Sequence, residues 1–148
     1  IWVNTDAAFT MIVWDWPHDE KVVKFLKVAE EALYKWIKKA IPWNKVWDIG
    51  NAIQNHIESN GFYVIKDLTG HWVGYTLHEK PYIPNYWMPG NWVVLKENML
   101  LAIEPIVWFS SGIIVDSKWF EIYVADGSIW AQFEHTIVVK PVYPEIIV

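Results

Sequence analysis

The chain has 148 residues, a formal charge of −5 and no cysteine. Its length suits one domain with one hydrophobic core, and its 53% apolar and 20% charged residues exclude a disordered or fibrous protein. The absence of cysteine excludes disulfides and thiolate metal sites and favours the cytosol. We therefore expect a single domain over residues 1–148 in the cytoplasm.

Two classes of partner are excluded by the charge and hydropathy patterns. No apolar run approaches the roughly 18 residues that span a bilayer, and the N-terminus lacks the charged and apolar regions of a signal peptide. The chain has no arginine, and half of its 12 lysines lie in residues 21–39. Because no broad basic surface results, we expect neither a membrane nor a nucleic acid as partner.

The first half of the chain predicts a strand followed by two helices. The apolar run of residues 7–14 predicts a buried strand, and the proline and acids after it are typical of a helix start. Apolar residues recur at helical spacing over residues 20–40, and Pro42 ends this helix. A second helix is expected over residues 48–60, with Gly61 as the glycine that follows its last turn.

After these helices the sequence pattern becomes that of β-strands. Alternating or continuous β-type runs occupy residues 62–68, 92–107, 112–115, 120–127 and 133–140. The turn signal Ala-Asp-Gly-Ser at residues 125–128 predicts a hairpin across residues 120–138. A strand, two helices and then antiparallel strands indicate an α+β domain.

Four ionisable residues lie in or beside apolar segments, where charge is costly: Asp6, His71, Glu104 and Glu134. A buried carboxylate must be paired, protonated or metal-bound. A salt bridge or an edge-strand position explains each residue singly, but less well all of them together, because the chain has no arginine to pair with them. Three carboxylates and one imidazole suit a divalent Mn, Fe, Co or Zn ion, which favours metal-dependent hydrolysis.

Motifs of other catalytic chemistries are missing. The chain contains no GxSxG elbow, phosphate-binding P-loop, GxGxxG or HExxH sequence. The segment LHEKP at residues 77–81 is not a zincin helix, because no second histidine follows at the required spacing.

Five segments carry a resemblance that covers nearly the whole chain: TDAAFT, IQNHIESNGFYVIKDLTGH, VGYTLHEKPYIPNY, LAIEPIV and DGSIWAQFEHTIVV. In this order and spacing the chain resembles the type I methionine aminopeptidases, metallopeptidases of the pita-bread fold. The resemblance implies a truncated pita-bread fold of the α+β class, with a curved antiparallel sheet and helices on its outer face.

The resemblance also implies a site. The family holds two divalent metal ions (Co, Mn, Fe or Zn) with five residues, of which four correspond to Asp6, His71, Glu104 and Glu134. His78 matches a histidine that hydrogen-bonds the scissile peptide. Such metals lower the pKa of a water and polarise the first peptide carbonyl, and Glu104 is expected to carry the proton to the departing amine.

The implied activity is removal of the N-terminal methionine from nascent proteins. A peptide or nascent-chain N-terminus is the expected partner, with association with the ribosome as a further expectation. Prolidases and other Xaa-Pro peptidases share the fold, but HEKPYIPNY and the pair Glu134 and His135 favour the methionine-specific branch. A pita-bread-like module that binds peptides without catalysis and a fragment without activity of its own remain as alternatives.

The chain departs from the family pattern at its N-terminus. The fifth metal ligand, an aspartate, would lie upstream of Ile1, as would the first strands of the domain. We therefore expect the chain to lack the N-terminal portion of the domain and to keep the four ligands of one metal position. Its activity is expected to be impaired.

The tryptophans form a second departure, since the chain has 12 of them against 7 glycines. Many occupy positions where the family usually has glycine, or where the neighbouring sequence favours a glycine: Trp2, Trp14, Trp16, Trp36, Trp43, Trp47, Trp72, Trp87, Trp92 and Trp119. Trp108 and Trp130 fit this pattern less well. At Trp72 an indole beside the presumed ligand His71 is expected to crowd the site.

Glycine permits positive φ and close approach, and a larger residue at such a position costs about 1–2 kcal/mol. Several such costs would rival the net stability of a domain, about 5–15 kcal/mol. We hypothesise that UGA codons, which some bacteria read as glycine, were translated as tryptophan. A mixture of UGG and UGA at these codons in the gene would contradict the hypothesis, and a genuinely aromatic-rich chain is the alternative.

Overall fold

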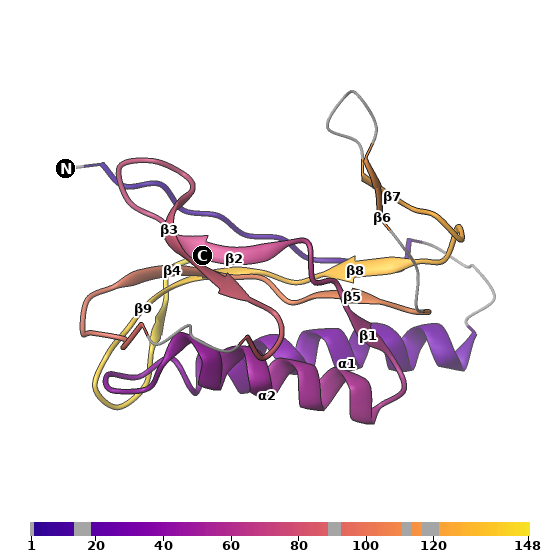
Figure 1. Cartoon of the computed structure of the whole chain (residues 1–148), viewed down its shortest axis with the longest axis horizontal. Helices are drawn as coiled ribbons and strands as arrows, with labels where there is room; N and C mark the ends of the chain where they lie inside the picture. The colour runs from indigo at the N-terminus through magenta and orange to yellow at the C-terminus, as the bar shows by residue number, and fades with distance from the viewer. Residues whose placement is uncertain (1, 14–18, 89–92, 111–113, 117–121) are drawn as a thin grey trace.

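The structure is a computed structural model and describes residues 2–13, 19–88, 93–110, 114–116 and 122–148. Its two helices lie together on one face of a layer of antiparallel strands (Figure 1). The helices are α1 (Glu20–Ile37) and α2 (Val46–Ser59). The strands are β1 (Tyr63–Val64), β2 (Thr69–Trp72), β3 (Glu79–Pro84), β4 (Leu100–Ile103), β5 (Ile106–Trp108), β6 (Ile114–Asp116), β7 (Ile122–Val124), β8 (Trp130–Gln132), β9 (His135–Val138) and β10 (Glu145–Ile146).

Helix α1 begins where the sequence predicts it. The Asp19 carboxylate accepts a hydrogen bond from the backbone N–H of Lys21 at 2.9 Å, which satisfies a donor that the first helical turn leaves free. The helix ends at Ile37, before the predicted end at Ala40, although Ala40 is still buried.

Helix α2 begins at Val46, slightly before its predicted start. The Asp48 carboxylate, in the first turn, reaches back to accept from the Lys45 N–H at 2.9 Å and fixes the entry to the helix. Gly61 follows the helix with φ of 84°, the left-handed conformation expected of a glycine at this place.

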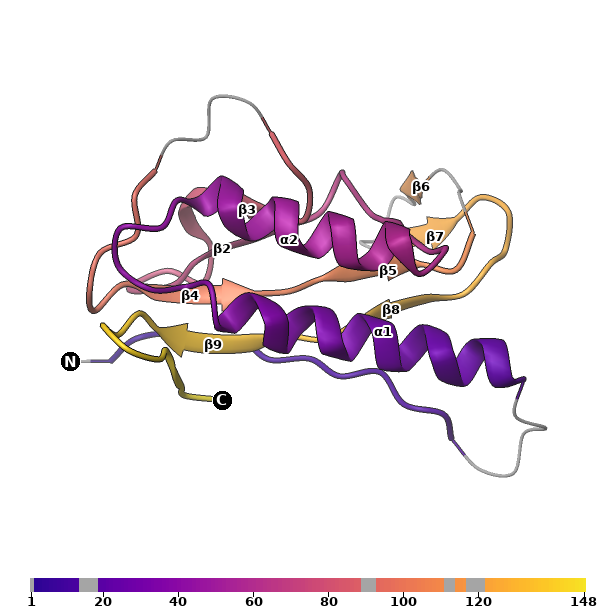
Figure 2. The ribbon, with the colours of Figure 1, turned by 90° about the horizontal axis from the view of Figure 1, so that it is seen from below.

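The hydrophobic core fills the space between the helices and the sheet. Figure 2 shows α1 and α2 side by side across the strands. Fully buried side chains come from both helices and from the strands beneath them: Phe25, Leu33, Trp36, Ile49, Ile53, Ile57, Leu101, Ile103, Val107 and Ile137. No helix among the residues that the structure describes combines the length and apolarity needed to cross a bilayer.

The described strands form one five-stranded sheet, in the order β10-β9-β4-β2-β3, one three-stranded sheet, in the order β1-β5-β8, and one two-stranded sheet, β6-β7. Only two residues, Glu104 and Pro105, connect β4 to β5. Another two, Phe133 and Glu134, connect β8 to β9. The chain passes between the five-stranded and three-stranded sheets at residues 65–68, 104–105 and 133–134, and each of the last two passages carries a glutamate.

The prediction of a buried strand at residues 7–14 was wrong for residues 7–13, and Trp14 lies outside the described residues. This segment makes one isolated bridge, between Ala8 and Glu134. Phe9 is 75% exposed, and Met11 and Val13 are also exposed. The apolar run predicted burial because apolar residues usually face a core, but this segment lies at a sheet edge, where every second side chain faces outward.

The predicted hairpin across residues 120–138 was also wrong. The turn is present, with Gly127 at φ of 68°, but β7 pairs with β6 and β8 pairs with β5. The paired strands β6 and β7 stand apart from the two larger sheets in Figure 1. A turn signal specifies a change of direction and does not specify which strands pair.

Trp43 has the backbone conformation of a glycine. Its φ is 77°, and Asn98 is the other non-glycine residue with positive φ in the described part of the chain. Three further tryptophans, Trp36, Trp72 and Trp108, hold a buried indole N–H with no hydrogen-bond partner among the described residues. Trp14, Trp16, Trp92 and Trp119 lie outside the described residues. The hypothesis of misread glycine codons stays a prediction.

Replacing Trp43 with glycine is expected to raise the free energy of unfolding by about 1 kcal/mol relative to alanine at the same position. The Trp43 side chain is 86% exposed, so its removal sacrifices little packing, whereas the left-handed backbone disfavours any residue with a Cβ. Urea unfolding of the Trp43→Gly and Trp43→Ala variants measures the difference. Equal stability of the two variants would show that this backbone carries no strain.

Candidate metal centre

His71 is held inside the five-stranded sheet, on the strand next to its β3 edge. It lies on β2, between β3 and β4, and its side chain is buried. Its Nδ1 donates a hydrogen bond to the Trp72 carbonyl at 3.1 Å, because a carbonyl can only accept. The lone pair of the neutral ring is thereby placed on Nε2, which lies 3.7 Å from Oε1 of Glu104.

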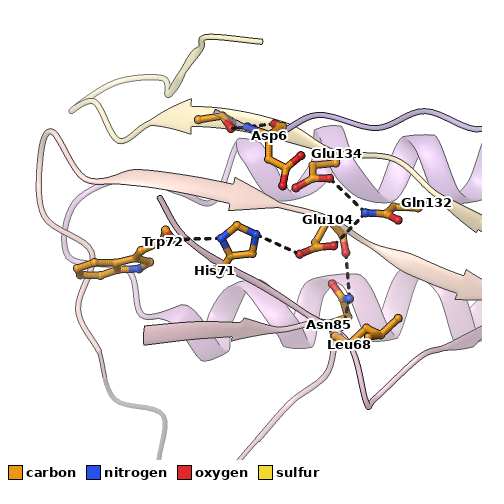
Figure 3. A network of polar contacts seen from close by, with 9 residues as sticks. Asp6, Leu68, His71, Trp72, Asn85, Glu104, Gln132 and Glu134 are labelled. Atoms are coloured by element: carbon orange, nitrogen blue, oxygen red, sulfur yellow. Dashed lines mark hydrogen bonds and ion pairs between the residues drawn. The ribbon is translucent and has the colours of Figure 1, made fainter. Parts of the chain in front are cut away.

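Trp72 does not crowd this site, contrary to the prediction. Successive side chains of a strand point to opposite faces of a sheet. The Trp72 indole therefore points away from the His71 ring (Figure 3) and packs against the hydrophobic core between the helices and the sheet.

Glu104 and Glu134 face each other across the junction of the two sheets. Glu104 is 9% exposed and Glu134 is 3% exposed. One amide group, Nε2 of Gln132, donates to Oε2 of Glu104 at 3.0 Å and to Oε2 of Glu134 at 3.1 Å (Figure 3). Oε1 of Glu134 is buried and has no hydrogen-bond partner in the described part of the structure.

The environment favours the protonated forms of both glutamates when no cation is present. Burial, followed by the charges of Glu134 and Asp6, raises the pKa of Glu104 to about 8. Burial, followed by the charge of Asp6, raises the pKa of Glu134 to about 7, against the lowering effect of the Gln132 hydrogen bond. Burial also lowers the pKa of His71, which keeps its ring neutral.

Asp6 reaches the site from the N-terminal segment. Its backbone N–H donates to Oγ1 of Thr136 at 2.8 Å, and the same hydroxyl donates to the Asp6 carbonyl at 2.8 Å. The segment is held again by mutual backbone hydrogen bonds between Ala8 and Glu134. The Asp6 side chain consequently faces the glutamates in Figure 3.

His78 lies in the loop between β2 and β3 and is exposed. Its ring centre is 4.4 Å from that of His71. The structure thus brings together all five residues singled out from the sequence. Potential ligand atoms lie within 4.8 Å of one another in two groups that share His71: one with Asp6 and His78, the other with Glu104 and Glu134.

Sequence reasoning missed three neutral residues that support this cluster: Gln132, Thr136 and Asn85. Nδ2 of Asn85, which is fully buried, donates to the Glu104 carbonyl at 3.0 Å and to the Leu68 carbonyl at 3.4 Å. Amides and hydroxyls occur throughout surface loops, so their residue type alone gave no signal. For Gln132, the available indication was its position two residues before Glu134, the spacing at which side chains of an extended segment point to the same side.

A cavity of about 280 Å³ opens beside the acidic cluster. Most of its lining side chains are apolar, and Thr69, His78, Glu104 and Gln132 form its polar part. The apolar lining residues come mainly from β5, β6 and the segment after β1: Ile65, Leu68, Ile106, Trp108 and Ile114. Such a cavity suits an apolar side chain whose polar end meets the cluster.

The residues of this cluster fit a divalent cation. The buried, unpartnered Oε1 of Glu134 lacks a positive or donating group, and an isolated buried carboxylate is unfavourable. A neutral imidazole nitrogen and carboxylate oxygens are ligands that Mn, Fe, Co and Zn all accept. The chemistry of the cluster is therefore that of a cation site with oxygen and nitrogen ligands.

Without metal, the free energy of unfolding is expected to fall as the pH rises from about 6.5 to 8, since below this range the lowered pKa of buried His71 changes the stability in the opposite direction. Both glutamate pKa values are raised above 4.5 in the folded protein, so in this window the folded state holds protons that the unfolded chain has lost. The slope approaches about 1.4 kcal/mol per pH unit for each group.

Urea unfolding in the presence of a chelator measures this pH dependence. A Glu134→Gln variant, which removes one of the two titrations, should show a flatter profile up to about pH 7. Stability that increases between about pH 6.5 and 8 would contradict the expected burial of these carboxyls.

The comparisons with known proteins agree with this geometry. Metallopeptidase family M24 matches residues 3–141. The chain is 44% identical over 138 residues to a methionine aminopeptidase of Mycoplasma capricolum, covering 92% of this chain and 54% of that protein. It is 38% identical over 146 residues to a methionine aminopeptidase of Clostridium perfringens, covering 97% of this chain and 57% of that protein.

The solved structures extend the similarity to the fold. The crystal structure of a Thermotoga maritima methionine aminopeptidase matches with a TM-score of 0.90 and 43% identity, covering 97% of this chain and 57% of that one. The prolidase of Pyrococcus furiosus, 23% identical, matches with a TM-score of 0.74 over 97% of this chain and 36% of that one, and shows the fold alone.

These matches confirm the predicted resemblance and the pita-bread fold of the α+β class. The chain spans little more than half the length of the methionine aminopeptidases that it matches. The family match nevertheless covers nearly all of this chain, and its acidic cluster suits a metal ion. The chain therefore belongs to metallopeptidase family M24.

Proposed function

We propose that this chain carries most of the active site of a metal-dependent aminopeptidase that removes the N-terminal methionine of nascent proteins. The observation that supports this most directly is the buried cluster of His71, Glu104 and Glu134 beside an apolar cavity. The methionine aminopeptidases that resemble the chain favour the same reaction. We place the activity in the cytoplasm, where nascent chains and the ribosome are its partners.

Asp6, His71, Glu104 and Glu134 are the proposed ligands of a Co, Mn, Fe or Zn ion. A bound metal would supply a Lewis acid and a water of lowered pKa. Glu104, which lies both in the cluster and at the cavity wall, is the proposed group that takes a proton from the water and releases it to the departing amine. With the four ligands of one metal position, the chain is proposed to hold one ion of the family's two.

His78 and the cavity are proposed to hold the peptide. The exposed His78 ring lies beside His71 at the polar part of the cavity, where it can hydrogen-bond the scissile peptide. The apolar walls suit an unbranched apolar side chain such as that of methionine, since burial of apolar surface favours its binding. Glu104 then lies at the cavity wall, within reach of the bond next to that residue.

Elemental analysis and peptide hydrolysis test the proposal together. The chain is expected to bind one divalent ion and to cleave a Met-Ala-Ser peptide after its methionine, more slowly than an intact relative. A bound metal and bound peptide without turnover would favour the non-catalytic binding module. Preference for an Xaa-Pro dipeptide over Met-Ala-Ser would favour a prolidase-like activity, and absence of metal would contradict both enzymes.

A further inference from the structure

We propose that Gln132 is a positioning residue that orients the two glutamates of the metal centre, so that each presents one carboxylate oxygen to the cation. This inference rests on the proposed metal site and assigns to Gln132 a role in building it. The residue lies at the end of β8, two residues before Glu134.

The hydrogen bonds of the Gln132 amide divide the four carboxylate oxygens into two pairs. Its Nε2 donates to Oε2 of Glu104 at 3.0 Å and to Oε2 of Glu134 at 3.1 Å. An amide nitrogen carries two hydrogens, so both bonds can form at the same time. The two Oε2 atoms are therefore occupied by one donor group.

The two remaining oxygens are the ones free for a cation. Oε1 of Glu104 lies 3.7 Å from Nε2 of His71. Oε1 of Glu134 is buried and has no hydrogen-bond partner within the described ranges. Because a carboxylate is rigid and planar, holding one oxygen also fixes the direction of the other. The Gln132 amide thus sets the direction in which both glutamates offer their free oxygen.

The charge of the donor matters as well as its position. A lysine or arginine here would neutralise the carboxylates and repel a divalent ion, whereas an amide donates without adding charge. Figure 3 shows the Gln132 side chain on the far side of the glutamates from His71. The cation site is left between the imidazole and the carboxylates.

Gln132 is itself held in place by the N-terminal segment. Its backbone N–H donates to Oγ1 of Thr10 at 3.0 Å, and this hydroxyl donates to the Gln132 carbonyl at 2.9 Å. Its strand also pairs with β5, where Gln132 is the partner of Ile106. The amide is therefore carried by a backbone fixed on both sides, as orientation of a ligand requires.

Cobalt binding by the 148-residue chain tests this role. Replacing Gln132 with leucine removes both donors at similar size, and the Co²⁺ affinity is expected to fall about 10- to 100-fold, as for other groups that orient metal ligands. The visible absorption of the bound Co²⁺ should also change, since the carboxylates are free to rotate. Gln54→Leu on α2, the same substitution outside the site, should leave affinity and spectrum unchanged.

If Gln132 contacted only the substrate and did not orient the glutamates, the same variant would give a different result. The residue also lines the apolar cavity, so it could contact only the substrate. In that case Gln132→Leu would alter KM for a Met-Ala-Ser peptide while the Co²⁺ affinity and spectrum stayed those of the unchanged chain. This outcome would overturn the positioning role and leave the proposed function intact.

A crystal structure of the metal-free Gln132→Leu variant completes the test. If the unchanged chain binds no Co²⁺, the proposed function fails, and this structure still decides the role of Gln132. Rotation of the Glu104 and Glu134 carboxylates away from their present directions would support the positioning role. Unaltered directions of both side chains would overturn it.

Discussion

Replacing His71 with alanine is expected to lower the affinity for a divalent metal by more than about 100-fold and to abolish peptide hydrolysis. Both candidate ligand groups in the described residues include this imidazole, so the substitution affects every arrangement of the metal that the cluster allows. The loss should exceed the 10- to 100-fold typical of residues that only orient a ligand. Calorimetric titration with Mn²⁺ measures it.

The control for this variant is His56→Ala. His56 lies on α2, where its Nδ1 is 2.9 Å from the Lys35 ammonium nitrogen and its Nε2 is 3.5 Å from Glu31. The substitution therefore removes a partly buried imidazole that belongs to neither candidate ligand group. Circular dichroism of both variants establishes that they fold. Metal affinity unchanged by His71→Ala in a folded protein would show that the cluster is not the metal centre.

Replacing Gly50 with alanine is expected to destabilise the domain by about 3 kcal/mol, the upper end of the range for overpacked cores. A Cβ at Gly50 would collide with the Tyr86 carbonyl oxygen and would lie 2.7 Å from that of Pro84. Both obstacles are backbone atoms, which cannot rotate aside. The collision also displaces Asn85, which holds the Glu104 carbonyl, so metal affinity should fall as well.

Urea unfolding followed by tryptophan fluorescence measures the loss. Asn51→Ala, at the next and exposed position of α2, should change stability by no more than about 0.5 kcal/mol. Alanine is a better helix former than glycine by roughly 1 kcal/mol, which opposes the expected loss. A Gly50→Ala variant as stable as the unchanged chain would show that α2 can move away from the end of β3 and avoid the collision.

The site residues could be predicted to different degrees. Asp6, His71, Glu104 and Glu134 stood out because a charged or imidazole side chain within an apolar segment needs a partner. The resemblance to the methionine aminopeptidases added His78, and the structure places it next to His71. Gln132, Thr136 and Asn85 could not be found in this way, since an amide or hydroxyl gains its role only from the atoms that surround it.

The fold was predicted well where local sequence decides and poorly where distant segments meet. Both helices follow from apolar spacing and from acids in their first turns. The edge position of residues 7–13 and the separate pairing of β7 and β8 depend on segments more distant in the sequence. For Trp72, the alternation of side chains along β2 turned an expected obstacle into a residue packed on the core.

By itself, the sequence determined the α+β class, the two helices and the residue types of a metal site, because these follow from local periodicity and from the cost of burying charge. Only the tertiary structure decided that Glu104 and Glu134 lie in passages between the sheets and share one amide donor. It also decided which carboxylate oxygen is left without a partner. These features depend on distances between atoms far apart in the chain, which no local pattern encodes.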